Sequence, residues 1–184
     1  MGRLRRPGQR DGAGNPTGRG RRRLFAERGY EGTSVDDLVR ALGVHRGSLY
    51  KVCGSKRGLY LAALRRHLDH EVLPLASAIA TAGDLPNALT QAAAAYDGGL
   101  AAGLLLLAAA ERAPTDHETA ELVTAGLTAL DLAIRQVLGL DGTPQALAYA
   151  LTAAVLGLPL RSRAGAEPTV GAEAVQALST HLHH

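Results

Sequence analysis

A run of apolar residues at spacings of three and four most constrains this fold. Leu61, Leu64, Leu68, Val72, Leu75 and Ile79 keep this spacing over 19 residues, which is the pattern of a helix buried along one side. The spacing predicts a long helix from about residue 55, which Ser55 can cap, to about residue 82. Pro74 lies inside it, and because proline lacks a backbone donor and clashes with the preceding turn, we expect a kink or break there.

The rest of the chain is also divided by Gly, Pro and capping residues into segments of helical periodicity. Aromatic residues make up only 3% of the chain and Trp is absent, whereas Ala and Leu, both strong helix formers, are abundant. We therefore predict an all-α protein of about nine helices. Their approximate ranges are residues 16–28, 34–42, 45–52, 55–82, 84–96, 100–112, 115–138, 143–158 and a last helix containing Val170, Val175 and Leu178.

The charges are strongly segregated along the chain. Residues 1–70 contain 16 Lys and Arg against 6 Asp and Glu, a net charge of +10, whereas residues 71–184 contain 4 against 11, a net charge of −7. A surface whose charges serve only solvation would not separate the signs in this way. The basic first part therefore predicts a polyanionic partner such as DNA, RNA or membrane phosphates.

Several classes of protein are disfavoured. The single cysteine, Cys53, cannot form an internal disulfide, and no secretory signal is apparent, so we expect a cytoplasmic protein. The apolar run of residues 100–110 is far shorter than the roughly 20 residues of a membrane span, so we expect that the protein does not cross a membrane. No catalytic triad, phosphate-binding glycine loop or paired-carboxylate motif stands out, so we expect neither an enzyme nor a cofactor. His67, His70 and Glu71 could share a metal, but such a set is more often a solvated face or part of a pocket wall, and we predict no metal site.

Residues 33–60 contain two short helical segments joined by Gly43, Val44 and His45. This could be a surface hairpin of helices, but the spacing is also that of a helix-turn-helix, whose second helix enters the major groove of DNA. If Leu49 and Val52 face inward, the second helix exposes residues that can contact bases or phosphates, namely Arg46, Gly47, Ser48, Tyr50 and Lys51.

The string LFAERGYEGTSVDDLVRALGVHRGSLYKVCGSKRGLYLAAL resembles the N-terminal domain of the tetracycline-repressor (TetR) family of transcriptional regulators. Residues 1–14 mix Arg with Gly and Pro and lack apolar periodicity, which predicts a disordered basic arm. The resemblance implies a helix-turn-helix domain over residues 15–54 and a ligand-binding and dimerisation domain over residues 55–184. It implies phosphate contacts for Thr33, Ser34, Tyr50 and Lys56 and base-edge contacts for Arg46, Gly47 and Ser48. His45 and Lys51 complete the predicted DNA-binding set, and His45 stands where the family usually has a hydroxyl cap.

The resemblance further implies a repressor that a small effector releases from a double-stranded DNA operator, and a homodimer formed through the last two helices. We predict an apolar or amphipathic effector because the expected pocket is aliphatic, with Leu64, Leu68, Tyr96, Leu104, Leu107 and Leu127 as its candidate lining. Asp97, Glu111 and Arg112 are candidate polar groups beside it. The alternative is a helical small-molecule binding or interaction protein whose helix-turn-helix does not read DNA.

Overall fold

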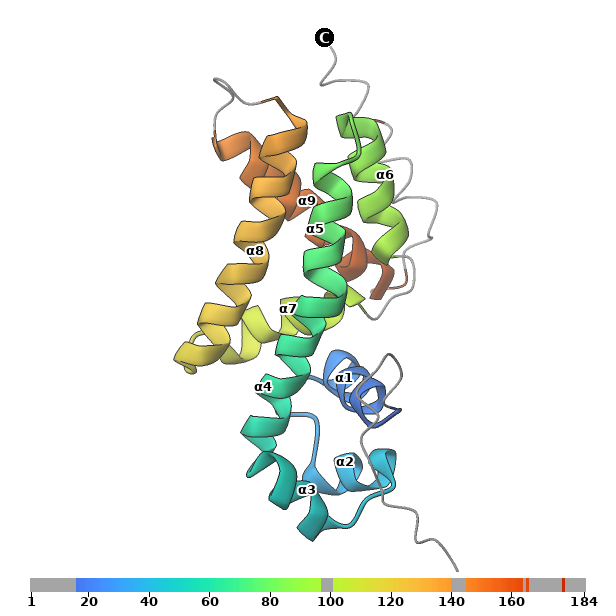
Figure 1. Ribbon diagram of the computed structural model, residues 1–184, viewed down its shortest axis with the longest axis vertical. Coiled ribbons are helices and arrows are strands. Elements are labelled where there is room, and N and C mark those ends of the chain that lie inside the picture. The colour runs from blue at the N-terminus through green and yellow to red at the C-terminus, as the bar shows by residue number, and fades with distance from the viewer. Residues whose placement is uncertain (1–15, 97–100, 140–144, 164, 166–176, 178–184) are drawn as a thin grey trace, which may run out of the picture.

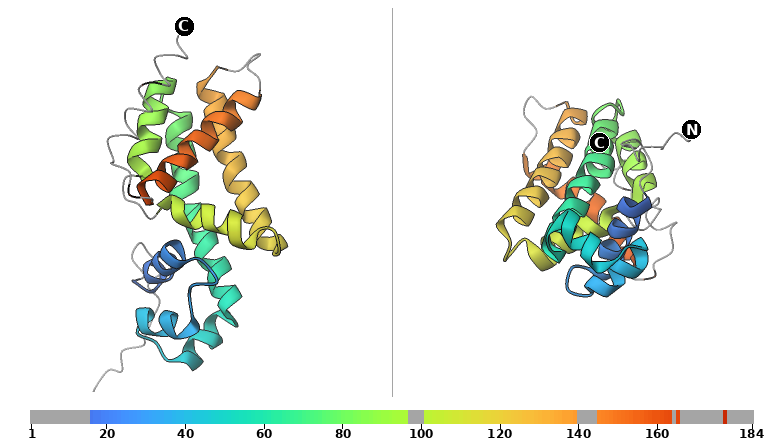
Figure 2. Two further views of the ribbon diagram at one scale, coloured as in Figure 1. Left: turned by 180° about the vertical axis from the view of Figure 1, so that it is seen from behind. Right: turned by 60° about the horizontal axis from the view of Figure 1, so that its bottom comes forward.

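The computed structural model describes residues 16–96, 101–139, 145–163, 165 and 177, and within this part of the chain every regular element is helical. Three short helices, α1 (Pro16–Arg28), α2 (Val35–Leu42) and α3 (Arg46–Cys53), form a small lobe at one end of the molecule (Figure 1). The larger lobe contains α5 (Leu73–Ala80), α6 (Leu85–Tyr96), α7 (Ala101–Leu107), α8 (His117–Val137) and α9 (Gln145–Arg163). Helix α4 (Lys56–His67) leads from one lobe into the other, as the left view in Figure 2 shows.

The predicted long helix is present and continues through Pro74. Between α4 and α5 lies a π-helical stretch, η1 (Leu68–Val72), and the N–H of Leu73 donates to the carbonyl of Leu68. Pro74 lies in the first turn of α5, where its missing N–H costs least. The hydrogen-bond spacing of the helix therefore changes just before the proline. The six apolar residues whose spacing predicted this helix, from Leu61 to Ile79, are all buried.

A second π-helical stretch, η2 (Ala108–Arg112), ends the helix that begins with α7. Counting α4–η1–α5 and α7–η2 each as one helix gives eight helices among the described residues. The ninth helix, predicted around Val170 to Leu178, and the arm over residues 1–14 lie outside the described residues. The all-α prediction is confirmed.

The core runs through both lobes without a gap. Phe25 and Leu38 of the small lobe, Leu64 of α4, and Leu130 and Ile134 of α8 belong to one cluster of buried side chains. Gly126 lets α8 approach its neighbours closely, because a Cβ there would lie 3.3 Å from a methyl group of Leu105. None of the helices described in the structure is long and apolar enough to span a membrane.

Candidate nucleic-acid interface

Local hydrogen bonds shape the hairpin of α2 and α3. Ser34 caps α2: its hydroxyl accepts from the N–H of Asp37 at 3.0 Å, and the Asp37 carboxylate accepts from the N–H of Ser34 at 3.1 Å. The Ser34 hydroxyl also donates to the Asp37 carboxylate at 2.6 Å, and this bond, together with the bond from the Ser34 N–H, holds the pKa of Asp37 below its usual value. Gly43 ends α2 with a φ of 61°, a left-handed conformation that other residues adopt only at a cost. The capping box and the glycine together fix where the first helix of the hairpin begins and ends.

Helix α3 packs through Leu49, which is 5% exposed, and turns its other side to solvent. His45 begins the helix without a side-chain capping bond, as expected for a residue in place of a hydroxyl. The side chains of Val52 and Cys53 lie outside what the structure describes. The exposed residues of this surface, which we call the reading face, are His45, Arg46, Gly47, Ser48, Tyr50 and Lys51.

The predicted phosphate contacts are placed differently from one another. Ser34 is exposed beside the N-terminus of α2, where backbone N–H groups favour an anion. Thr33, in contrast, is completely buried, and its hydroxyl donates to the carbonyl of Gly29 at 2.7 Å. Lys56 is half-buried, with its Nζ 4.2 Å from the centre of the Tyr30 ring. A phosphate contact by Thr33 would require this loop to open, whereas Ser34 and Lys56 need no such change.

Three of the six aromatic residues meet where the small lobe joins α4. The ring of Phe25 lies edge-on to Tyr60 at 5.1 Å, and Tyr30 lies edge-on to Tyr60 at 5.0 Å. Tyr60 is 1% exposed, and this burial raises the pKa of its hydroxyl. Edge-to-face contacts of this kind are stabilising and direction-dependent, so the cluster orients α1 and its following loop on α4.

A buried carboxylate joins the start of α4 to the start of α8. Asp116 caps α8 by accepting from the N–H of Thr119 at 3.1 Å, and it accepts two hydrogen bonds from Arg57 at 2.6 and 2.9 Å. Arg112 adds a third charged bond at 3.2 Å. Hydrogen bonding by Arg57 holds the pKa of Asp116 well below its usual range. Asp116 is therefore a buried ionic link between the two lobes.

The loop after α1 is held by η2. The Glu111 carboxylate accepts from the N–H of Tyr30 at 2.8 Å, and the Arg112 guanidinium lies 4.5 Å from the centre of the Tyr30 ring. Gly29, at a φ of 72°, leaves room for Glu111, because a Cβ there would collide with its carboxylate. Glu111 and Arg112, considered above as polar groups of an effector pocket, thus lie at the contact between the lobes.

The candidate effector residues are mostly part of the packed core. Leu64, Leu68 and Leu104 are buried in the main cluster, and Leu107 and Leu127 are half-buried. The side chain of Tyr96 and the whole of Asp97 lie outside the described residues.

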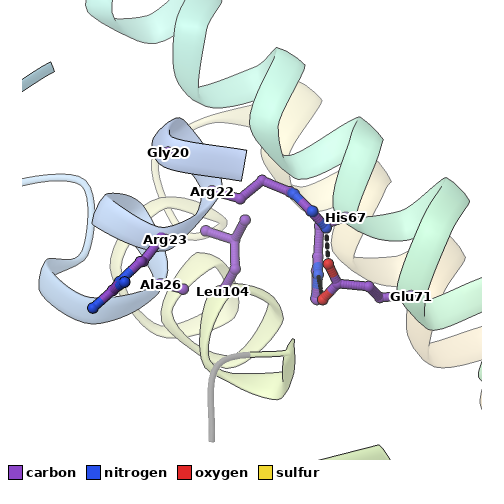
Figure 3. A pocket seen from close by; sticks show the side chains of 7 residues that line it. All are labelled: Gly20, Arg22, Arg23, Ala26, His67, Glu71 and Leu104. Carbon is purple, nitrogen blue, oxygen red and sulfur yellow. Dashed lines mark hydrogen bonds and ion pairs between the residues drawn. The ribbon is translucent and has the colours of Figure 1, made fainter. Parts of the chain in front are cut away.

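The structure shows a pocket in a different place, between α1, the α4–η1 helix and α7 (Figure 3). Its lining consists of Gly20, Arg22, Arg23, Ala26, His67, Glu71 and Leu104. Leu104 is the member that this pocket shares with the predicted lining. No sequence signal singled out Arg22, and His67 and Glu71 were noted only through their spacing along one helix. In the part of the chain that the structure describes, no group of three His, Cys, Asp or Glu could hold a metal ion.

The similarity to known protein sequences is concentrated in the small lobe and the first part of α4. Residues 22–63 match the family model described as bacterial regulatory proteins, tetR family. An uncharacterized HTH-type transcriptional regulator of Bacillus subtilis, YezE, is 38% identical over 66 residues, which are 36% of this chain and 34% of that protein. The chain thus spans about a third of the length of the curated relatives it matches. These relatives include proteins named as repressors and one named as an activator.

The likeness to solved structures extends over nearly the whole chain. A transcriptional regulator from Rhodococcus sp. Rha1 is 27% identical, with a TM-score of 0.73 over 87% of this chain and 90% of that one. CifR, described as a TetR family transcriptional regulator and solved as a cysteine mutant with a 26-base-pair operator DNA, has a TM-score of 0.76 and is 22% identical, over 96% of this chain and 97% of its own. The second likeness shows a shared fold.

Proposed function

Because the chain belongs to the tetR family of bacterial regulatory proteins through residues 22–63, we propose that it is a DNA-binding transcriptional regulator. The observation that carries this proposal is the reading face, which lies on the exposed side of the second helix of a capped hairpin inside the matched segment. Arg46 can donate to a guanine, Ser48 can donate or accept, and Tyr50 and Lys51 can reach phosphates. A regulator of this kind acts in the cytoplasm, where bacterial DNA lies.

Within that function we propose a repressor that leaves its operator when a small apolar or amphipathic effector binds. Support comes from the relatives named as repressors and from the position of α4, which packs against α1 and α3 of the small lobe and against α7 and α8 of the larger lobe. A ligand that favours one pose of this helix would change the position of the reading face, and DNA binding would in turn weaken ligand binding by the same factor.

We also propose that the regulator is a homodimer. Of the two helices predicted to form its interface, the first corresponds to α9 and the second, around Val170 to Leu178, lies outside the described residues, so the described part of the proposed interface is α8 and α9. Helices α8 and α9 pack against each other, and large apolar side chains remain exposed on both of them. These are Leu132, Tyr149 and Leu160, which are 57%, 49% and 53% exposed. A two-fold axis at this surface would pair two reading faces, as two half-sites on DNA require.

The reading face is tested by Arg46→Ala. Its guanidinium lies 3.7 Å from the exposed Asp36 carboxylate, a weak pair that DNA can displace. DNA fragments that the purified protein retains at moderate salt would first identify the site. On that site we expect Arg46→Ala to cost about 1–3 kcal/mol and to relax base preference, because a bidentate contact to a base edge is lost.

The matched control is Lys51→Ala on the same helix. Loss of a phosphate contact should weaken all DNA sequences alike and reduce the salt dependence of binding. Both variants are compared by fluorescence anisotropy on the selected site and on scrambled DNA. If both variants lose the same amount of affinity on the selected site and on scrambled DNA, base reading by Arg46 is contradicted. If the wild type itself binds DNA weakly and without sequence preference, a helical binding protein that does not read DNA is favoured.

The dimer is tested by Leu132→Glu and Tyr149→Glu. We expect wild type to sediment at dimer mass at micromolar concentration and each variant to dissociate at least about tenfold more readily, because a charge in an apolar interface must be desolvated. Leu73→Glu, at an apolar position of α5 that is 43% exposed, is the control and should remain dimeric. A wild-type protein of monomer mass that still binds its DNA site would contradict this proposal.

A further inference from the structure

The pocket beside α1 lies at the junction of the lobes, where an occupant would touch both. Gly20, Arg22, Arg23 and Ala26 come from α1, while His67 and Glu71 come from the helix that enters the larger lobe and Leu104 comes from α7. Its volume of about 450 Å³ is in the range of pockets that hold small organic molecules. Figure 3 shows the side chains of Arg22, His67 and Glu71 meeting at one side of this pocket, with Arg23 pointing away.

His67, one of the lining residues, has an unused hydrogen-bond acceptor. Its side chain is 2% exposed, and its Nδ1 lies 2.9 Å from Oε2 of Glu71. A carboxylate can only accept, so Nδ1 carries the proton of the neutral ring and Nε2 holds a lone pair. Burial and the nearby Arg22 lower the pKa of His67 to about 4, which keeps the ring neutral near pH 7. Among the described residues, Nε2 is buried with no hydrogen-bond partner, a rare condition in proteins.

The other lining groups limit what could donate to Nε2. A cation would face the Arg22 guanidinium, and an anion would face the Glu71 carboxylate and the lone pair of Nε2. Ala26 and Leu104 supply an apolar surface. We propose that the pocket binds a neutral hydroxyl compound with an apolar body, of the phenol or alcohol class, whose O–H donates to Nε2 of His67.

Such a ligand would act on the contact between α1 and the larger lobe. Glu71 pairs with His67 through one oxygen and with Arg22 of α1 through the other. Glu71 lies in η1, and Glu111, which holds the other end of α1 through Tyr30, lies in η2. Single π-helical turns are frequent at functional sites because they change the register of a helix locally. A ligand that moves His67 therefore shifts one of the two carboxylates that hold α1, and this regulatory part of the inference rests on the proposed function.

The test uses the full chain, labelled with ¹⁵N-histidine, and two probes of nearly equal shape. 4-Methylphenol has the donor, whereas in 4-methylanisole a methyl group replaces the hydroxyl hydrogen. We expect 4-methylphenol to shift the Nε2 resonance of His67 and to bind at least about tenfold more tightly than 4-methylanisole. His67→Phe assigns the resonance and should remove the preference, and His70→Phe, at an exposed position one turn away, should keep it.

Equal affinity for the two probes would overturn the proposed site. So would an unchanged His67 resonance, which is the result expected if an ordered water satisfies Nε2. These results do not depend on DNA. If the protein binds its DNA site and 4-methylphenol weakens that binding in wild type but not in His67→Phe, the regulatory role is supported. If the probe binds at His67 but leaves DNA affinity unchanged, the regulatory role is overturned and the proposed site stands. If the protein binds no DNA at all, that result counts against the proposed function alone.

Discussion

Replacing Asp116 by Ala is expected to lower the free energy of unfolding by about 2–4 kcal/mol. The carboxylate, whose side chain is 4% exposed, accepts from Arg57, Arg112 and the N–H of Thr119, so its removal uncaps α8 and leaves two guanidinium groups without their shared partner. The side chains of Arg57 and Arg112 are 45% and 20% exposed, and water can therefore offset part of the loss. Urea denaturation followed by circular dichroism measures the change.

The matched control is Glu118→Ala, two residues further along in the first turn of the same helix. Glu118 also pairs with Arg57 and Arg65, but its side chain is 37% exposed. Exposed pairs contribute about 0–1 kcal/mol, so this variant should be close to wild type. A loss at Asp116 no larger than the loss at Glu118 would show that the buried carboxylate does not hold the lobes together.

Lowering the pH from 7 to 4.5 is expected to remove about 2–3 kcal/mol of stability through His67 alone. In the folded protein its pKa is about 4, because the ring is buried and Arg22 of α1 lies nearby. Glu71 does not reverse this direction, since it also pairs with Arg22. In the unfolded chain a histidine has a pKa of about 6.5 and takes up a proton first. The stability is therefore complete above about pH 6.5 and is lost as the pH falls towards 4.

Denaturation curves at pH 7.0, 5.5 and 4.5 measure this dependence. His67→Phe does not titrate and should flatten the change, whereas His70→Phe should retain it because His70 is exposed. Asp116 does not obscure the result: its pKa is depressed in the folded state, so its contribution is kept above the unfolded value of about 3.9 and is lost only below it. An equal pH dependence in wild type and His67→Phe would contradict the buried, neutral state of this histidine.

The features that depend on near neighbours in the chain could be predicted from the sequence. The start of α2 near Thr33 or Ser34, its end at Gly43 and the single buried side of the long helix follow from capping, left-handed glycine and apolar spacing, and the structure places the cap at Ser34. Each involves groups within about one or two turns of each other, so the residues that make the contact stand together in the sequence. The exposure of Arg46, Gly47 and Ser48 follows in the same way from the inward side chain of Leu49.

Contacts between distant segments were decided only by the tertiary structure. Asp116 and Arg57 are 59 positions apart, and Glu111 and Tyr30 are 81 apart, with no periodicity to link them. Thr33 is buried because α1 and its loop close over it, although the family resemblance implied a phosphate contact for it. The pocket of His67 arises in the same way, from three helices whose packing sets which side chains meet and which acceptor is left without a donor. Local hydrogen bonding and periodicity do not encode that packing, because it depends on how whole helices fit together.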